Sequence, residues 1–237
     1  QNTLEKTFLK AKDAQRYRDF TLAEKLLLEI IEDDPLHLEA RKELSSLYFR
    51  NGDYDQSLSI ANTGLQIDAY HIGLNYCAGI AYMASKDWIN AKEHLGWAAR
   101  SMAYRSTANT LLAQINMIEK KYKDAKHYND IALKYNSENI NALSQQAMLY
   151  RIMGEKENAI QTISAIEKID PINHFAVYEK HLLGEADKNA VTDSHKSEFP
   201  YQTFLELALF YHNRNQNSEA IKILKSGPKH LLNSLWL

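Results

Sequence analysis

The residues of this sequence that could do chemistry are nine histidines, one cysteine and several short acidic runs. His174 and His181 stand seven positions apart, so on a helix they would share one face and could supply two metal ligands. The residue between them on that face is Tyr178, and the nearest carboxylate, Glu179, points elsewhere. Two histidines without a third ligand make a poor zinc site. We therefore predict no metal site, and a surface or packing role for both histidines.

The single cysteine, Cys77, excludes an internal disulfide and a multi-cysteine metal site. It lies beside the small Gly79 in an expected helix, which favours a packed thiol over a nucleophile. The sequence contains no G-x-G-x-x-G, G-x-x-x-x-G-K-[ST], G-x-S-x-G or H-E-x-x-H motif. We therefore predict that the chain is not an enzyme and uses no cofactor.

Composition narrows the class of protein further. The 237 residues include only eight Gly and four Pro, and good helix formers are abundant, which indicates an all-helical chain. The formal net charge of −2 provides no field that would attract nucleic acid, so no nucleic-acid partner is expected. No apolar run is long enough to span a membrane, and no signal peptide is evident. The sequence leaves the compartment open between cytoplasm and periplasm.

The elements that carry these residues repeat. Five ungapped copies of 34 residues begin at Leu4, Leu38, Ile72, Ser106 and Ile140. The eighth position of each copy is small: Ala11, Ser45, Gly79, Ala113 and Ala147. The twentieth is small as well: Ala23, Ser57, Ala91, Ala125 and Ala159. Position seventeen is aromatic in Phe20, Tyr54, Trp88 and Tyr122, and Lys156 is the exception.

Turn-prone stretches such as "RNGD" (50–53) lie between the two small positions, so each copy predicts a helix, a short turn and a second helix. The small residues would let the two backbones approach, and the aromatic would fill the space beside the turn. This pattern resembles the tetratricopeptide repeat (TPR) over residues 4–173. The resemblance implies an all-α, right-handed superhelical solenoid of stacked helix-turn-helix units. The RNA-reading pentatricopeptide repeat fits less well, because the chain is slightly acidic and the aromatics recur.

The pattern changes toward the C-terminus. We predict five regular units over 1–173, an irregular and degenerate unit over 174–200, and a further hairpin with the start of another helix over 201–237, in a fragment of a longer protein. The phrases "DPINHF" (170–175) and "FPYQTFLELA" (199–208) are similar to the repeat region of large bacterial multidomain proteins with an upstream galactose-mutarotase-like domain. That resemblance implies a carbohydrate-related parent protein, with which the repeats could make an intramolecular contact, and no catalytic role for them.

The TPR resemblance also implies which residues face a concave groove, namely positions two, five, nine, twelve and thirteen of each first helix. The groove residues carried over in this way are Lys12, Arg16, Lys42, Phe49, Arg50, Tyr76, Ile80, Met83, Thr110, Gln114, Met117, Met148 and Arg151, with Gln15, Glu39 and Gly73 at equivalent positions. The TPR subclass that captures a carboxylate uses Lys at position five and Asn at position nine. Lys42 is instead followed by Ser46, so that ligand is not expected.

These residues predict a non-enzymatic scaffold that binds a protein or peptide partner in its concave groove, where Met and aromatic side chains adapt to apolar surfaces. The alternative is a structural or oligomerisation arm of a larger carbohydrate-related bacterial protein. Apolar groove positions could equally pack against the next helix or be covered by another part of the same chain.

Overall fold

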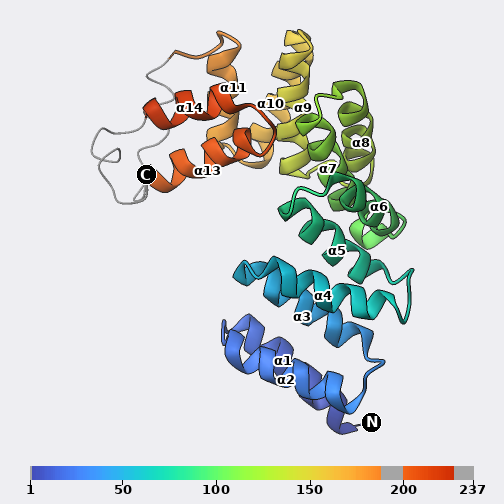
Figure 1. Ribbon diagram of the computed structural model, residues 1–237. Helices are drawn as coiled ribbons and strands as arrows, with labels where there is room; N and C mark the ends of the chain where they lie inside the picture. Colours follow the sequence, from blue (N-terminus) through green and yellow to red (C-terminus); the bar gives the residue numbers. More distant parts are fainter. Residues whose placement is uncertain (1, 188–199, 227–237) are drawn as a thin grey trace. The chain divides into compact units, whose positions relative to one another are not determined.

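The computed structural model describes residues 2–187 and 200–226, and every regular element in these ranges is an α-helix. The helices are α1 (Asn2–Arg16), α2 (Phe20–Asp33), α3 (Leu38–Asn51), α4 (Tyr54–Leu65), α5 (Ile72–Ala84), α6 (Trp88–Ala98), α7 (Met102–Ile118), α8 (Tyr122–Tyr135), α9 (Ile140–Ile152), α10 (Lys156–Ile169), α11 (His174–Leu182), α13 (Pro200–His212) and α14 (Asn217–Ser226) (Figure 1). The predicted all-α class is confirmed. The chain packs as two compact units, Gln1–Ala108 (the N-terminal unit) and Asn109–Leu237 (the C-terminal unit).

Consecutive helices pair as antiparallel hairpins, and the same turn closes each hairpin. Position fifteen of all five copies has a left-handed backbone: φ is +62° at Arg18, +86° at Gly52, +62° at Lys86, +61° at Lys120 and +79° at Gly154. The next backbone N–H returns to a carbonyl of the first helix, as from Asp53 N to Tyr48 O (2.9 Å). This is the C-terminal helix motif that favours Gly. The turn therefore sets where the first helix of each of the five copies ends.

The last residue of four of the five copies caps the following first helix; the exception is Arg105, which lies inside α7. His37 Nδ1 and His71 Nδ1 accept from Ala40 N (3.1 Å) and Leu74 N (3.2 Å). Asn139 and Asn173 use their amide oxygens in the same way, each at 3.1 Å. Such caps satisfy a helix N–H that would otherwise lack a partner. Because the histidine Nδ1 atoms accept, each ring carries its proton on Nε2.

The small residues hold the two helices of a hairpin together, as predicted. All ten are buried. Ser45 Oγ lies 2.8 Å from Ser57 O, which joins positions eight and twenty of one copy. A Cβ on Gly79 would stand 2.8 Å from Leu95 Cγ and 3.2 Å from Leu95 N, so only Gly permits this approach.

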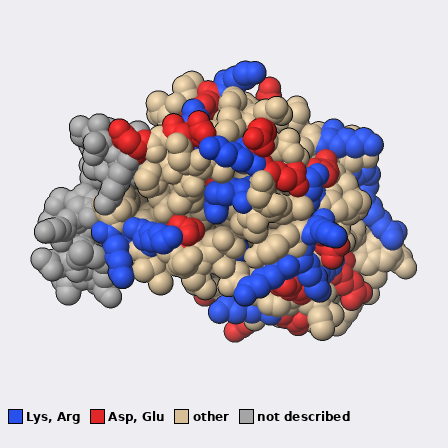
Figure 2. All heavy atoms as spheres, turned by 90° about the horizontal axis from the view of Figure 1, so that it is seen from above, with Lys and Arg blue, Asp and Glu red and all other residues tan. Residues whose placement is uncertain are grey.

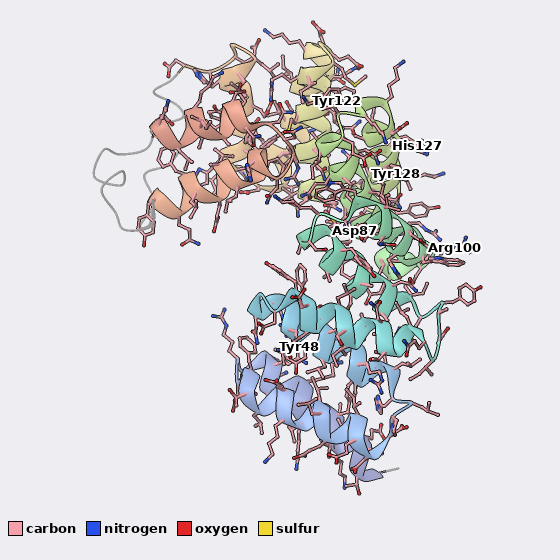
Figure 3. All side chains as sticks on the ribbon, viewed as in Figure 1. Tyr48, Asp87, Arg100, Tyr122, His127 and Tyr128 are labelled. Carbon is pink, nitrogen blue, oxygen red and sulfur yellow. The ribbon has the colours of Figure 1, made fainter. Side chains whose placement is uncertain are left out.

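The position-seventeen aromatics begin the second helices, as Tyr122 does for α8 in Figure 3. They are less enclosed than predicted. Tyr54 is 44% exposed, and its ring packs 5.2 Å from that of Phe49. Phe20 and Tyr122, by contrast, are half-buried and pack against the core clusters of their units.

Two departures from the repeat are visible. α7 begins at Met102, four residues before the predicted start of its copy at Ser106. α11 has nine residues, and its left-handed turn residue is Gly184 (φ +75°), four residues earlier than the register requires. Four residues are about one helical turn. The rest of the predicted irregular unit (188–199) and the predicted final helix start (within 227–237) lie outside the described residues.

None of the helices in the described ranges is both long and apolar enough to cross a bilayer.

Candidate functional site

A continuous chain of polar contacts crosses the surface formed by α1, α3 and the start of α5 in the N-terminal unit. Gln15 joins α1 to α3, because its amide accepts from Arg50 Nη2 and donates to Glu43 Oε2 at 3.4 Å. Lys42 Nζ then lies 3.3 Å from Glu43 Oε1 and 2.5 Å from Glu39 Oε2. Glu39 Oε1 is 3.2 Å from His71 Nε2. We call these six residues, Gln15, Glu39, Lys42, Glu43, Arg50 and His71, the polar row.

A pocket of about 410 Å³ opens at the end of this row. We call it the N-terminal pocket; it is lined by Glu39, Lys42, Asp68, Tyr70, His71, Ile72, Gly73, Ser101 and Tyr104. The ring of Tyr104 packs 4.9 Å from that of Tyr76, so this predicted groove residue lies behind the pocket wall. The pocket thus combines charged groups with aromatic rings.

Lys42 and Gly73 both line the pocket, and the stem of Lys42 packs directly against Gly73. A Cβ at Gly73 would stand 2.5 Å from Lys42 Cδ. Although partial burial acts to lower it, the pKa of Lys42 is raised above its ordinary value by the hydrogen bond to Glu39 and the charges of Glu43 and Glu39. Burial likewise acts to raise the pKa of Glu39, but Lys42 and His71 hold it below its ordinary value. Both groups are therefore charged at neutral pH.

An aromatic rim continues outward from the pocket. Tyr70 is 64% exposed, and its ring lies 4.7 Å from that of Trp97. The guanidinium of Arg100, labelled at the end of α6 in Figure 3, sits 3.9 Å from the Trp97 ring centroid. Exposed aromatic rings of this kind offer large contact area at low entropic cost.

The other end of the polar row is basic and open. Lys12, Arg16 and Arg50 are exposed, with Arg50 stacked 5.5 Å over the Phe20 ring. The remaining predicted groove residues of this unit, Phe49, Ile80 and Met83, are half-buried. Figure 2, which views the molecule from above Figure 1 and does not label this end of the row, shows Lys and Arg interspersed with Asp and Glu on the face it draws.

The C-terminal unit differs. Met117 and Met148 are both 0% exposed and Thr110 is 5% exposed, so these three predicted groove residues are buried within the chain. Met117 and Met148 belong to one core cluster with Phe204, Leu207 and Tyr211 of α13. Thr110 lies on the side of α7 that contacts α9, where the backbone carbonyl of Thr110 accepts from Gln145 Nε2 (3.1 Å).

The C-terminal hairpin of the same chain, formed by α13 and α14, covers these predicted groove residues. Gln114 Nε2 donates to Asn213 O and Asn215 Nδ2 donates to Ile118 O, each at 3.1 Å, so the α13–α14 turn lies on the end of α7. Arg151 donates to Glu179 of α11. Gln114 and Arg151, both predicted groove residues, are thus engaged inside the fold.

Sequence reasoning missed Glu43, Tyr70, His71 and Tyr104 of the site. Tyr70 and Tyr104 both occupy position thirty-three of their copies, and His71 occupies position thirty-four. Only five positions of each first helix were expected to face a partner, so position six (Glu43) and the last two positions of a copy were left out. The recurrence of Tyr at position thirty-three in successive copies was a signal that could have found the aromatic wall.

Two of the residues first considered for chemistry make contacts within the chain. Cys77 is 1% exposed; burial raises the pKa of its thiol, although hydrogen bonds from Ser46 and Ser45 act against this. His181 Nδ1 lies 3.2 Å from Ala186 O. Within the described ranges, no three or more His, Cys, Asp or Glu residues are grouped so as to hold a metal ion.

Antiparallel hairpins in a 34-residue register define a helical-repeat protein. Residues 140–173 match the model of the tetratricopeptide repeat family. The fold is similar to PilW, a type IV pilus biogenesis factor, with a TM-score of 0.73 at 15% identity over 86% of this chain and 99% of that one. It is similar to PilF of Pseudomonas aeruginosa (TM-score 0.72, 16% identity, 92% and 96% covered).

A third similar structure is YrrB, with a TM-score of 0.56 at 17% identity over 87% of this chain and 94% of that one. YrrB is described as a TPR protein with an unusual peptide-binding site. By sequence, no curated protein matches the chain. The chain therefore has the tetratricopeptide repeat fold.

Proposed function

We propose that this chain is a non-enzymatic interaction module that binds an extended segment of a protein partner across the N-terminal unit. The segment lies along the polar row and places one side chain in the N-terminal pocket. The observation that carries the proposal is the pocket itself, which is open, about 410 Å³ in volume, and walled by Tyr70 and Tyr104 beside paired charges.

The polar row suits a backbone and its polar side chains. Its members satisfy one another only in part, because Glu39 keeps 51% of its side chain exposed and Arg50 is exposed. A bound segment could donate to Glu39 and accept from Arg50 without breaking the row. The aromatic rim adds apolar contact, which is where binding energy concentrates at interfaces.

The C-terminal unit is not proposed as a second site of this kind, since its own hairpin covers the equivalent positions. The similarity to YrrB supports peptide binding as a use of this fold.

The test is a displayed library of random twelve-residue peptides, enriched on the full chain. We expect enriched peptides to bind the wild-type chain and to lose binding at least tenfold, about 1.4 kcal/mol, on Tyr70→Ala/Tyr104→Ala. Ile89→Ala is the control, because Ile89 is 79% exposed on α6 outside the pocket lining. Failure to enrich any pocket-dependent peptide would overturn the proposal and favour the alternative, a structural arm of a larger carbohydrate-related bacterial protein that contacts an upstream domain.

A further inference from the structure

The N-terminal pocket contains more negative than positive charge. Glu39 and Asp68 line it, and Lys42 is the single lysine or arginine of its lining. A third carboxylate, that of Glu43, lies beside the pocket with Oε1 3.3 Å from Lys42 Nζ. The ammonium of Lys42 is therefore outnumbered by carboxylates, and a ligand that enters the pocket meets an excess of negative charge.

Asp68 keeps one carboxylate oxygen open toward a ligand. Its side chain is exposed, and Oδ1 accepts from Tyr70 N at 2.9 Å, whereas Oδ2 has no partner among the residues that the structure describes. His71 adds no positive charge to the lining, because its Nδ1 accepts the Leu74 N–H and therefore carries no proton. Asp68 thus offers an acceptor that nothing in the described part of the chain neutralises.

Tyrosine rings form two further walls of the pocket. Tyr70 is 64% exposed, and the hydroxyl oxygen of Tyr104 would lie 3.4 Å from a Cβ at Gly73, so its phenol end borders the start of α5. The face of an aromatic ring carries partial negative charge and attracts cations. The rim already holds one guanidinium of the chain itself, since Arg100 lies 3.9 Å from the centroid of the Trp97 ring, which packs against Tyr70.

We propose that the N-terminal pocket selects an arginine side chain of the bound segment. This inference rests on the proposed function and names the residue type that the pocket accepts. The guanidinium donates to Asp68 Oδ2 and to Glu39, whose ionised carboxylate is 51% exposed and can accept further hydrogen bonds. Arginine suits these walls better than lysine, because its planar fork bonds carboxylates at two points and stacks on aromatic rings.

An acidic side chain is the competing occupant, because Lys42 also lines the pocket. The Lys42 ammonium, however, already lies 2.5 Å from Glu39 Oε2, and only 21% of its side chain is exposed. A ligand carboxylate would have to replace Glu39 or Glu43 at this ammonium while approaching the open oxygen of Asp68. Complementarity of charge therefore favours a cation.

The first test uses three displayed peptide libraries that differ only in a fixed central residue, which is Arg, Glu or Leu, with five random residues on each side. Each library is enriched on the full chain, and the peptides are then screened for loss of binding on Tyr70→Ala/Tyr104→Ala. We expect the pocket-dependent peptides to come from the arginine library. If they come from the glutamate or leucine library instead, this inference falls and the proposed function stands. If no library yields them, both fall.

The second test removes the charge of Asp68 and keeps its turn. In Asp68→Asn the amide oxygen can still accept from Tyr70 N. We expect a selected arginine peptide to bind this variant about tenfold more weakly, the effect of losing a charge-assisted hydrogen bond. Asp55→Asn is the matched control, because it removes the same charge from the exposed first turn of α4, outside the pocket lining, and should leave the dissociation constant unchanged. Equal affinities for the two variants would overturn the inference.

A change in the peptide shows whether its arginine contacts Asp68. Replacing that arginine by citrulline removes the charge and keeps the shape, and should weaken binding to the wild-type chain about tenfold. The same replacement should have little further effect on Asp68→Asn, because both changes remove one interaction. Effects that simply add would contradict the contact and overturn the inference.

Discussion

Arg151 and Glu179 form a buried, two-point ion pair in the C-terminal unit. Arg151 Nε lies 2.6 Å from Glu179 Oε2, and Nη2 lies 3.1 Å from Oε1, while the Glu179 side chain is 0% exposed. Tyr211 OH donates to the same carboxylate at 2.5 Å. These contacts join α9, α11 and α13, and so hold the C-terminal hairpin against the helices whose groove positions it covers.

Removing one partner of this ion pair should lower the stability of the C-terminal unit. Arg151→Ala leaves the Glu179 carboxylate buried without its cation, and we expect a loss of about 3–5 kcal/mol in the free energy of unfolding of the C-terminal unit. Urea denaturation followed by circular dichroism measures it. The control is Lys156→Ala, which breaks an exposed ion pair to Glu185 (2.6 Å) and should cost about 1 kcal/mol or less. Equal losses for the two variants would contradict the role of burial.

Substitution by alanine should have opposite effects on stability at two glycines, one in the left-handed turn and one inside a helix. Gly52→Ala places a side chain at φ +86° and should destabilise the N-terminal unit by about 1–2 kcal/mol. Gly96→Ala lies inside α6, where an added Cβ meets nothing within 4 Å, and should stabilise by about 0.5–1 kcal/mol. Thermal unfolding of both variants is the measurement. A stabilising Gly52→Ala would show that the turn does not need its left-handed residue.

Because of Tyr48, the free energy of unfolding should depend on pH in the alkaline range. Burial raises its pKa to about 12, and the hydrogen bond to Glu24 (2.9 Å) adds to the shift, against about 10 in the unfolded chain. Because the folded pKa is the higher one, the stabilisation is complete below pH 10 and is lost as the pH rises through 12. Figure 3 shows Tyr48 on α3.

Tyr48→Phe should therefore cost about 1 kcal/mol at neutral pH. The stability difference between wild type and this variant, measured by urea denaturation at several pH values, should shrink between pH 10 and 12. A difference that stays constant to pH 12 would show that the phenol does not titrate as part of the folded structure.

Most of the fold could be predicted from sequence patterns that lie within a single copy of the repeat. Small residues at positions eight and twenty and turn signals between them located the regular helices, because these features act within one copy. They could not reveal the cover over Met117, since Gln114 and Asn213 are 99 residues apart and meet only after several hairpins have packed. Glu179 likewise gave no sign that it would bind Arg151 of the preceding hairpin.

The pocket was partly predictable for the same reason. Lys42 and Tyr76 followed from their positions in the first helices, whereas Tyr70 lies between α4 and α5, and Tyr104 lies in the first turn of α7, before the predicted start of its copy. Gly73 showed only its smallness in the sequence. Its importance, to let the stem of Lys42 cross α5, depends on a contact between two hairpins.

The most direct test of the account is the dissociation constant of one library-selected peptide for three forms of the full chain, measured by fluorescence anisotropy. We predict at least tenfold weaker binding to Tyr70→Ala/Tyr104→Ala, and unchanged binding to Met148→Leu, which alters the covered position of the C-terminal unit while conserving volume. Binding that survives the tyrosine variant but is lost in Met148→Leu would contradict the account, because it would place the partner in the C-terminal unit.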